Sequence, residues 1–113
     1  MLKKGGKIEK VYYSIGEVAE LFEVNQSLIR YWEKEFDILK PQKNKKGNRL
    51  FTKQDINNLR IIYHLVKERG YTLSGARDKL RYNREDIEKT VEIIDSLQKV
   101  RTYLLTVRDG LNE

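Results

Sequence analysis

The side chains with the clearest chemical potential lie in residues 25–36, NQSLIRYWEKEF. Leu28, Ile29, Trp32 and Phe36 are spaced as on one buried face of a helix, which Asn25 is expected to cap. The other face carries amide, hydroxyl, guanidinium and phenol groups, on Gln26, Ser27, Arg30 and Tyr31. Such groups hydrogen-bond to phosphates and base edges. We therefore expect this helix to bind DNA, although Arg30 could instead pair with Glu33 or Glu35 and Tyr31 could belong to the core.

A second candidate segment, residues 40–53, holds six Lys or Arg residues and no acid. Its Lys-Gly-Asn turn at 46–48 and the apolar pair at 50–51 predict a β-hairpin, with a solvated loop as the alternative. Coming directly after the expected DNA-binding helix at 25–36, such a hairpin would be the wing of a winged helix. We expect contacts with the phosphate backbone of DNA from Lys43, Lys45, Lys46 and Asn48.

Charge is unevenly distributed along the 113 residues. Residues 1–80 have a net charge of +7, and residues 81–113 have a net charge of −1. A basic front part suggests a polyanionic partner there, although ordinary solubilising charge would also account for it.

The composition excludes several kinds of chemistry. There is no cysteine, and His64 is the single histidine, so the sequence offers no disulfide, thiolate nucleophile or histidine cluster for a metal. Asp37 and Asp55 are better explained by helix ends than by catalysis. We expect no enzyme activity, no metal and no cofactor. Without a membrane-length apolar run or a signal peptide, the protein is expected to be cytoplasmic.

The elements that position the DNA-binding helix begin at Ser14. Ser14 and Glu17 form a capping box for a helix at 15–22, and Glu23 stands at the turn into the next helix, where glycine is often found. This spacing is typical of a helix-turn-helix.

Two further helices should follow the hairpin. Thr52 and Asp55 form a second capping box, which starts a helix running to about residue 69. Gly70 should end it, and Thr72 should cap a short helix at 73–80.

From residue 83 onward, apolar residues recur every three or four positions, close to a heptad repeat. They are Ile87, Val91, Ile94, Leu97, Val100, Leu104, Val107 and Leu111. A lone helix cannot bury such a stripe, so we expect it to form a homodimer rather than to pack within the chain. The spacing does not distinguish parallel from antiparallel pairing.

Five segments resemble the MerR family of bacterial transcription regulators. They are residues 13–21, 28–33, 47–51, 55–62 and 70–73, which read YSIGEVAEL, LIRYWE, GNRLF, DINNLRII and GYTL. The resemblance implies a mainly α fold, with a winged helix-turn-helix, a small β-hairpin wing, a helix pair and a long C-terminal coiled-coil helix. The expected division is a flexible basic arm at 1–11, a DNA-binding domain at 12–81 and a dimerisation helix at 82–113.

The same resemblance implies residue roles. Arg30 and Tyr31 match the family's arginine–aromatic pair, Arg49 matches its wing arginine, and Ser14, Gln26 and Ser27 match positions that face DNA. Tyr71 would contact phosphates from a second wing. Family members bind near-palindromic operators as dimers and bend or untwist promoter DNA for RNA polymerase.

The chain departs from the family pattern at Trp32, where a second tyrosine is common, and it carries no effector domain or metal-binding cysteines. It is therefore either an effector-less member or a fragment. A protein-interaction adaptor and an architectural DNA-binding protein are the alternatives to a regulator, because a fold does not determine function.

Overall fold

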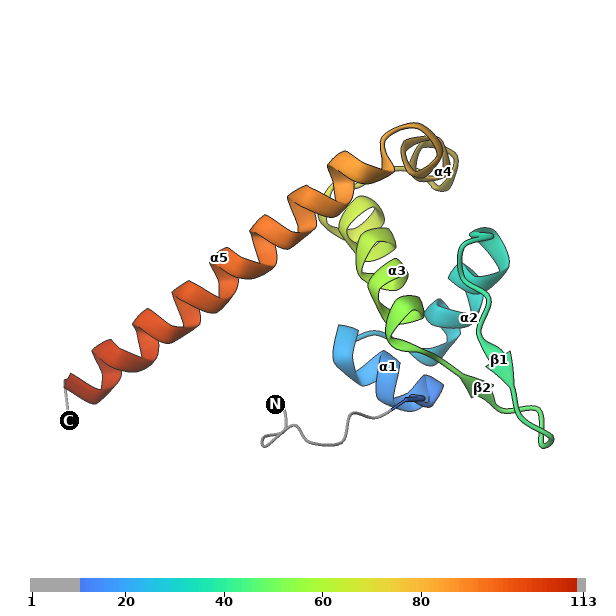
Figure 1. The fold of residues 1–113 in the computed structure, drawn as a ribbon, viewed down its shortest axis with the longest axis horizontal. Coiled ribbons are helices and arrows are strands. Elements are labelled where there is room, and N and C mark those ends of the chain that lie inside the picture. The colour runs from blue at the N-terminus through green and yellow to red at the C-terminus, as the bar shows by residue number, and fades with distance from the viewer. Residues whose placement is uncertain (1–10, 112–113) are drawn as a thin grey trace. The chain divides into compact units, whose positions relative to one another are not determined.

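The computed structural model describes residues 11–111, so the predicted basic arm lies outside the described residues except for Val11. Within that range the structure is mainly helical with one β-hairpin, as predicted (Figure 1). The elements in chain order are α1 (Ile15–Phe22), α2 (Gln26–Glu35), β1 (Gln42–Lys43), β2 (Arg49–Leu50), α3 (Lys53–Tyr63), a π-helix η1 (His64–Glu68), α4 (Leu73–Tyr82) and α5 (Arg84–Leu111).

The chain divides into two compact units, and the boundary in the sequence falls between Arg60 and Ile61 within α3. In the second unit, α4 contacts both η1 and α5. The predicted boundary at residues 81 and 82 therefore separates two helices that are in contact.

The capping box predicted for α1 is present. The Ser14 amide donates to Oε1 of Glu17 at 2.8 Å, and the Glu17 amide donates to Oγ of Ser14 at 3.1 Å. Glu23 ends α1 in the left-handed region, at φ 54°, where most residues other than glycine are strained. Asn25 begins α2 as expected, but its side chain makes no capping hydrogen bond, which corrects the role predicted for its amide group.

The core of the first unit lies under α1 and α2. Its buried side chains are Val18, Ala19, Ile29, Trp32, Phe36, Leu39, Phe51 and Leu59. The buried stripe predicted for α2 is thus confirmed at Ile29, Trp32 and Phe36, whereas Leu28 is half-buried.

The predicted hairpin is a short antiparallel pair in which Gln42 faces Leu50 and Lys43 faces Arg49. One further bridge, between Tyr13 and Phe51, ties the start of the unit to the end of the hairpin through two backbone hydrogen bonds of 2.8 and 2.9 Å.

The second capping box, the glycine stop and the Thr72 cap are also present. The helix after Thr52 is α-helical only to Tyr63, and its last turn is the π-helix η1, which the sequence analysis did not predict. His64 begins that turn with 4% exposure, and its Nδ1 lies 2.9 Å from Oε1 of Glu68. A π turn often accommodates a local packing demand, and here it contains a buried imidazole.

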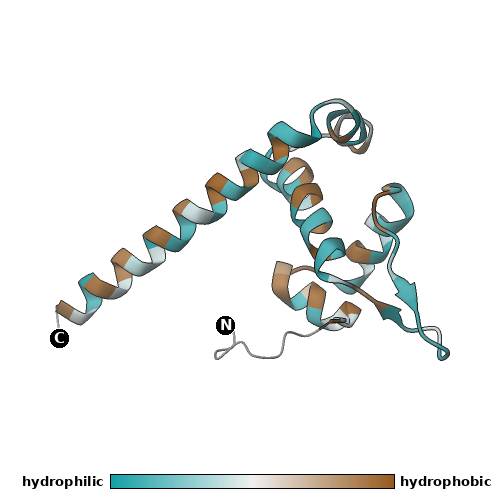
Figure 2. Cartoon of the chain, viewed as in Figure 1, coloured by the Kyte–Doolittle hydropathy of each residue, from teal (hydrophilic) through white to brown (hydrophobic). Residues whose placement is uncertain are grey.

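Helix α5 carries the predicted apolar stripe, visible as brown residues recurring along its length in Figure 2. The stripe has two parts. Ile87 and Val91 are 7% and 6% exposed, so the chain itself already covers these two predicted dimer positions. Ile94 is half-buried, and the exposed part consists of Leu97, Val100, Leu104, Val107 and Leu111.

Candidate nucleic-acid interface

A surface groove in the first unit brings together residues from the start of α1, from α2 and from the hairpin. It is lined by Tyr12, Tyr13, Ser14, Ile15, Gln26, Arg30, Asn44, Gly47, Asn48, Arg49 and Leu50. Five of these were predicted to bind DNA from sequence: Ser14, Gln26, Arg30, Asn48 and Arg49. Among the described residues that line it there are two guanidinium groups and no carboxylate, which suits an anionic ligand.

Helix α2 presents Gln26 and Arg30 one turn apart on the wall of this groove. The Gln26 amide lies against α1 at Gly16, since a Cβ atom added at Gly16 would lie 3.4 Å from Nε2 of Gln26. Arg30 is exposed, and within residues 11–111 it makes no ion pair with Glu33 or Glu35. Its guanidinium is therefore available to a phosphate or a guanine edge.

The hairpin also lines the groove, and Asn44 organises the turn of this hairpin. Its Oδ1 accepts the amide hydrogens of Lys46 and Asn48 at 2.9 and 3.0 Å. The Gly47 amide donates to the Asn44 carbonyl at 2.9 Å, and Gly47 adopts φ 84°, which favours glycine. These bonds give the basic turn a defined shape.

Arg49 connects the hairpin to α2. Its Nε lies 2.5 Å from Oε1 of Glu33, and the two side chains are 24% and 20% exposed. Glu33 thus pairs with the wing arginine and not with Arg30, the possibility considered from sequence.

Other predicted DNA-binding residues lie outside the groove lining. Tyr31 is 46% exposed and is therefore not a core residue, and Ser27 is exposed beside it on α2. The three lysines of the wing, Lys43, Lys45 and Lys46, are exposed as well. Exposed lysines suit contacts with a phosphate backbone that runs past the groove.

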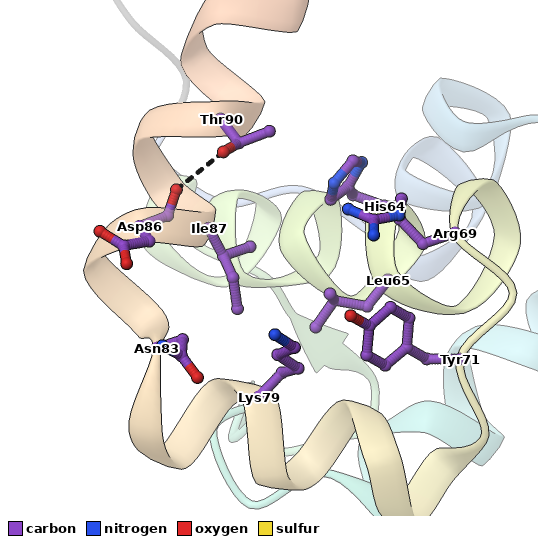
Figure 3. A pocket seen from close by; sticks show the side chains of 9 residues that line it. All are labelled: His64, Leu65, Arg69, Tyr71, Lys79, Asn83, Asp86, Ile87 and Thr90. Atoms are coloured by element: carbon purple, nitrogen blue, oxygen red, sulfur yellow. Dashed lines mark hydrogen bonds between the residues drawn. The ribbon is translucent and has the colours of Figure 1, made fainter.

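Tyr71 belongs to the second unit, where it lines a small cavity between η1, α4 and α5 (Figure 3). The Arg69 guanidinium lies 5.6 Å from the centre of its ring and the Lys79 ammonium 5.9 Å from it. These distances are within the range of cation–π attraction. Tyr71 therefore lies beside two cations, an environment suited to the phosphate contact predicted for it.

Tyr12 and Asn44 are among the groove residues that were not predicted from sequence. The Tyr12 hydroxyl donates to Oε1 of Gln42 at 3.4 Å, which connects the segment before α1 to β1. Asn44 carried a usable signal, because asparagine before a Gly-containing turn commonly bonds to the backbone two residues on. Tyr12 carried none, since its partner is 30 residues away.

Residues 11–111 contain no group of three or more His, Asp or Glu side chains that could hold a metal ion. In the same range, no helix combines the length and apolarity needed to cross a membrane.

Comparison with known proteins places this geometry in context. The profile of the MerR HTH family regulatory proteins matches residues 13–83. The HTH-type transcriptional regulator MlrA of Escherichia coli (strain K12) is 33% identical over 92 residues, which cover 81% of this chain and 37% of that protein. The chain thus spans less than half the length of this relative.

Two solved structures share the fold. A MerR family transcriptional regulator from Bacillus cereus matches with a TM-score of 0.56 at 23% identity, over 88% of this chain and 79% of the other. The regulator HiNmlR, described as lacking the sensor domain and bound to promoter DNA, matches with a TM-score of 0.54 at 20% identity, over 88% and 87% of the two chains.

Proposed function

Because the chain belongs to the MerR family of helix-turn-helix regulatory proteins, we propose that it is a sequence-specific regulator of transcription that binds double-stranded DNA. The observation that carries the proposal is the groove of the first unit. There Gln26 and Arg30 of α2 and Asn48 and Arg49 of the hairpin line one groove, and its described lining residues include no carboxylate.

In the proposed complex α2 enters the major groove, where Gln26 and Arg30 meet base edges or phosphates. The hairpin follows the adjacent minor groove or its phosphates, with Arg49 as its anchor. Lys43, Lys45 and Lys46 add attraction that is independent of sequence and sensitive to salt. Ser27 and Tyr31 extend the contacts of α2, and Tyr71 contacts phosphates from the second unit.

We propose that the protein binds as a homodimer through the exposed part of the α5 stripe. Two copies related by a twofold axis match a near-palindromic operator. Bending or untwisting of that DNA would align promoter elements for RNA polymerase, a form of readout through DNA shape.

The test is selection of binding sites from random duplex DNA, followed by fluorescence anisotropy on the selected site and on random DNA across salt. The wild type should select an inverted repeat and prefer it to random DNA by roughly 10³-fold or more. Arg30→Ala should reduce this preference, because Arg30 lines the groove and forms no ion pair with any residue in the range 11–111. Arg101→Ala, which removes the same charge from an exposed position on α5, is the matched control.

Binding that is steeply salt-dependent but blind to sequence would overturn the regulator in favour of an architectural DNA-binding protein. Absence of DNA binding would favour the protein-interaction adaptor.

A further inference from the structure

The contact between Glu33 and Arg49 joins two parts of the candidate interface that are 16 residues apart in sequence. Glu33 lies in the last turn of α2, and Arg49 begins β2. Both side chains are about four-fifths buried, which protects the pair from the solvent screening that weakens surface ion pairs. The contact is therefore suited to hold the hairpin against α2.

Apart from the Glu33–Arg49 pair, the Tyr12–Gln42 hydrogen bond connects the hairpin to the segment before α1. Asn44 fixes the shape of the hairpin turn but does not attach it to α2. The two strands of the hairpin are two residues long, and isolated hairpins are marginally stable in water. The backbone bridge between Tyr13 and Phe51 restrains the base of the hairpin but not its turn. The ion pair between Arg49 of β2 and Glu33 of α2 adds a direct restraint between the hairpin and α2.

The guanidinium of Arg49 has five N–H donors, and the contact with Glu33 uses the one on Nε. Arg49 also lines the groove, and its two terminal nitrogens take no part in the Nε contact with Glu33. One side chain can thus be held by Glu33 and still present donors to a ligand.

We propose that Glu33 is a positioning residue that sets the spacing between α2 and the wing by holding Arg49. This inference rests on the proposed function and deepens it. Reading a DNA site with both elements requires that they enter neighbouring grooves in one register. Glu33 therefore contributes to discrimination between DNA sites, although its own charge repels phosphate.

That repulsion makes the test decisive, because the two explanations predict opposite signs. If only charge mattered, Glu33→Ala would strengthen binding to every DNA. If Glu33 positions the wing, Glu33→Ala should weaken binding to the selected site by roughly ten-fold, while affinity for random DNA stays unchanged or rises. Glu20→Ala is the matched control, since it removes the same charge from an exposed position on α1.

A double-mutant cycle with Arg49→Ala tests whether Glu33 acts on DNA binding through Arg49. The double variant should lose no more affinity for the selected site than Arg49→Ala alone, because each change removes the same contact. Glu33→Ala binding the selected site as tightly as wild type, or strictly additive losses in the double variant, would overturn the proposal.

Hydrogen exchange of the free protein separates this inference from the proposed function. In the Glu33→Ala variant, the amide hydrogens of residues 42–50 should exchange faster than they do in the wild type or in Glu20→Ala. If wild type selects no DNA site, the proposed regulator fails, whereas unchanged exchange in the hairpin removes the positioning role itself.

Discussion

Replacing Leu104 by serine is expected to weaken self-association of the chain by roughly 30- to 300-fold. Leu104 is 58% exposed on α5, in the middle of the exposed part of the stripe. Burying a whole leucine side chain contributes about 1.5–3 kcal/mol, so burying the exposed share contributes about 0.9–1.7 kcal/mol. A symmetric dimer contains the residue twice, which gives about 2–3.5 kcal/mol.

Sedimentation equilibrium over a range of protein concentrations measures this change. Circular dichroism should show unchanged helicity at high concentration, because the serine replaces a side chain that the single chain leaves exposed. Arg101→Ser, on the same helix and also exposed, should leave the dissociation constant within about two-fold. A wild-type protein that stays monomeric at 100 µM or more, or a Leu104→Ser dimer as tight as wild type, would refute the assignment of this stripe to dimerisation.

Three further predictions concern the first unit. Glu23→Gly should raise the free energy of unfolding by about 0.5–1 kcal/mol, because glycine adopts the left-handed conformation without strain. Glu20→Gly, inside α1, should lower it by about 1 kcal/mol. Urea unfolding that changes the stability of both variants in the same direction would contradict this. Trp32 is 1% exposed, so Trp32→Ala should lower the free energy of unfolding by about 3–5 kcal/mol in thermal or urea unfolding. Tyr31→Ala should lower it by less than about 1 kcal/mol, and an equal loss for the two variants would place Tyr31 in the core. Asn44→Ala should leave two turn amides without their acceptor and weaken DNA binding in anisotropy, and unchanged binding would mean that the turn keeps its shape without Asn44.

Helix starts were predictable from sequence because they depend on residues three positions apart. The pairs Ser14–Glu17 and Thr52–Asp55 form the reciprocal bonds that their spacing predicts, and Gly70 takes the positive φ expected at a helix end. The polar face of α2 was equally readable, since helical periodicity alone separates Arg30 from Trp32. Asn25 is the exception. Its position before α2 is the one expected for a capping residue, but its side chain makes no capping hydrogen bond.

The site residues follow the same division. Gln26, Arg30, Asn48 and Arg49 could be proposed from residue type and from resemblance to the family. Their convergence on one groove, together with Tyr12 and Asn44, depends on how α1, α2 and the hairpin pack.

By itself, the sequence determined the helical class, the helix boundaries set by local caps, the basic hairpin and the apolar stripe of α5, because each follows from short-range periodicity or from single-residue conformational preference. Only the tertiary structure decided that Glu33 holds Arg49, that a π turn buries His64, and that Ile87 and Val91 are covered by their own chain. These features depend on distances between segments far apart in sequence, which local pattern does not encode.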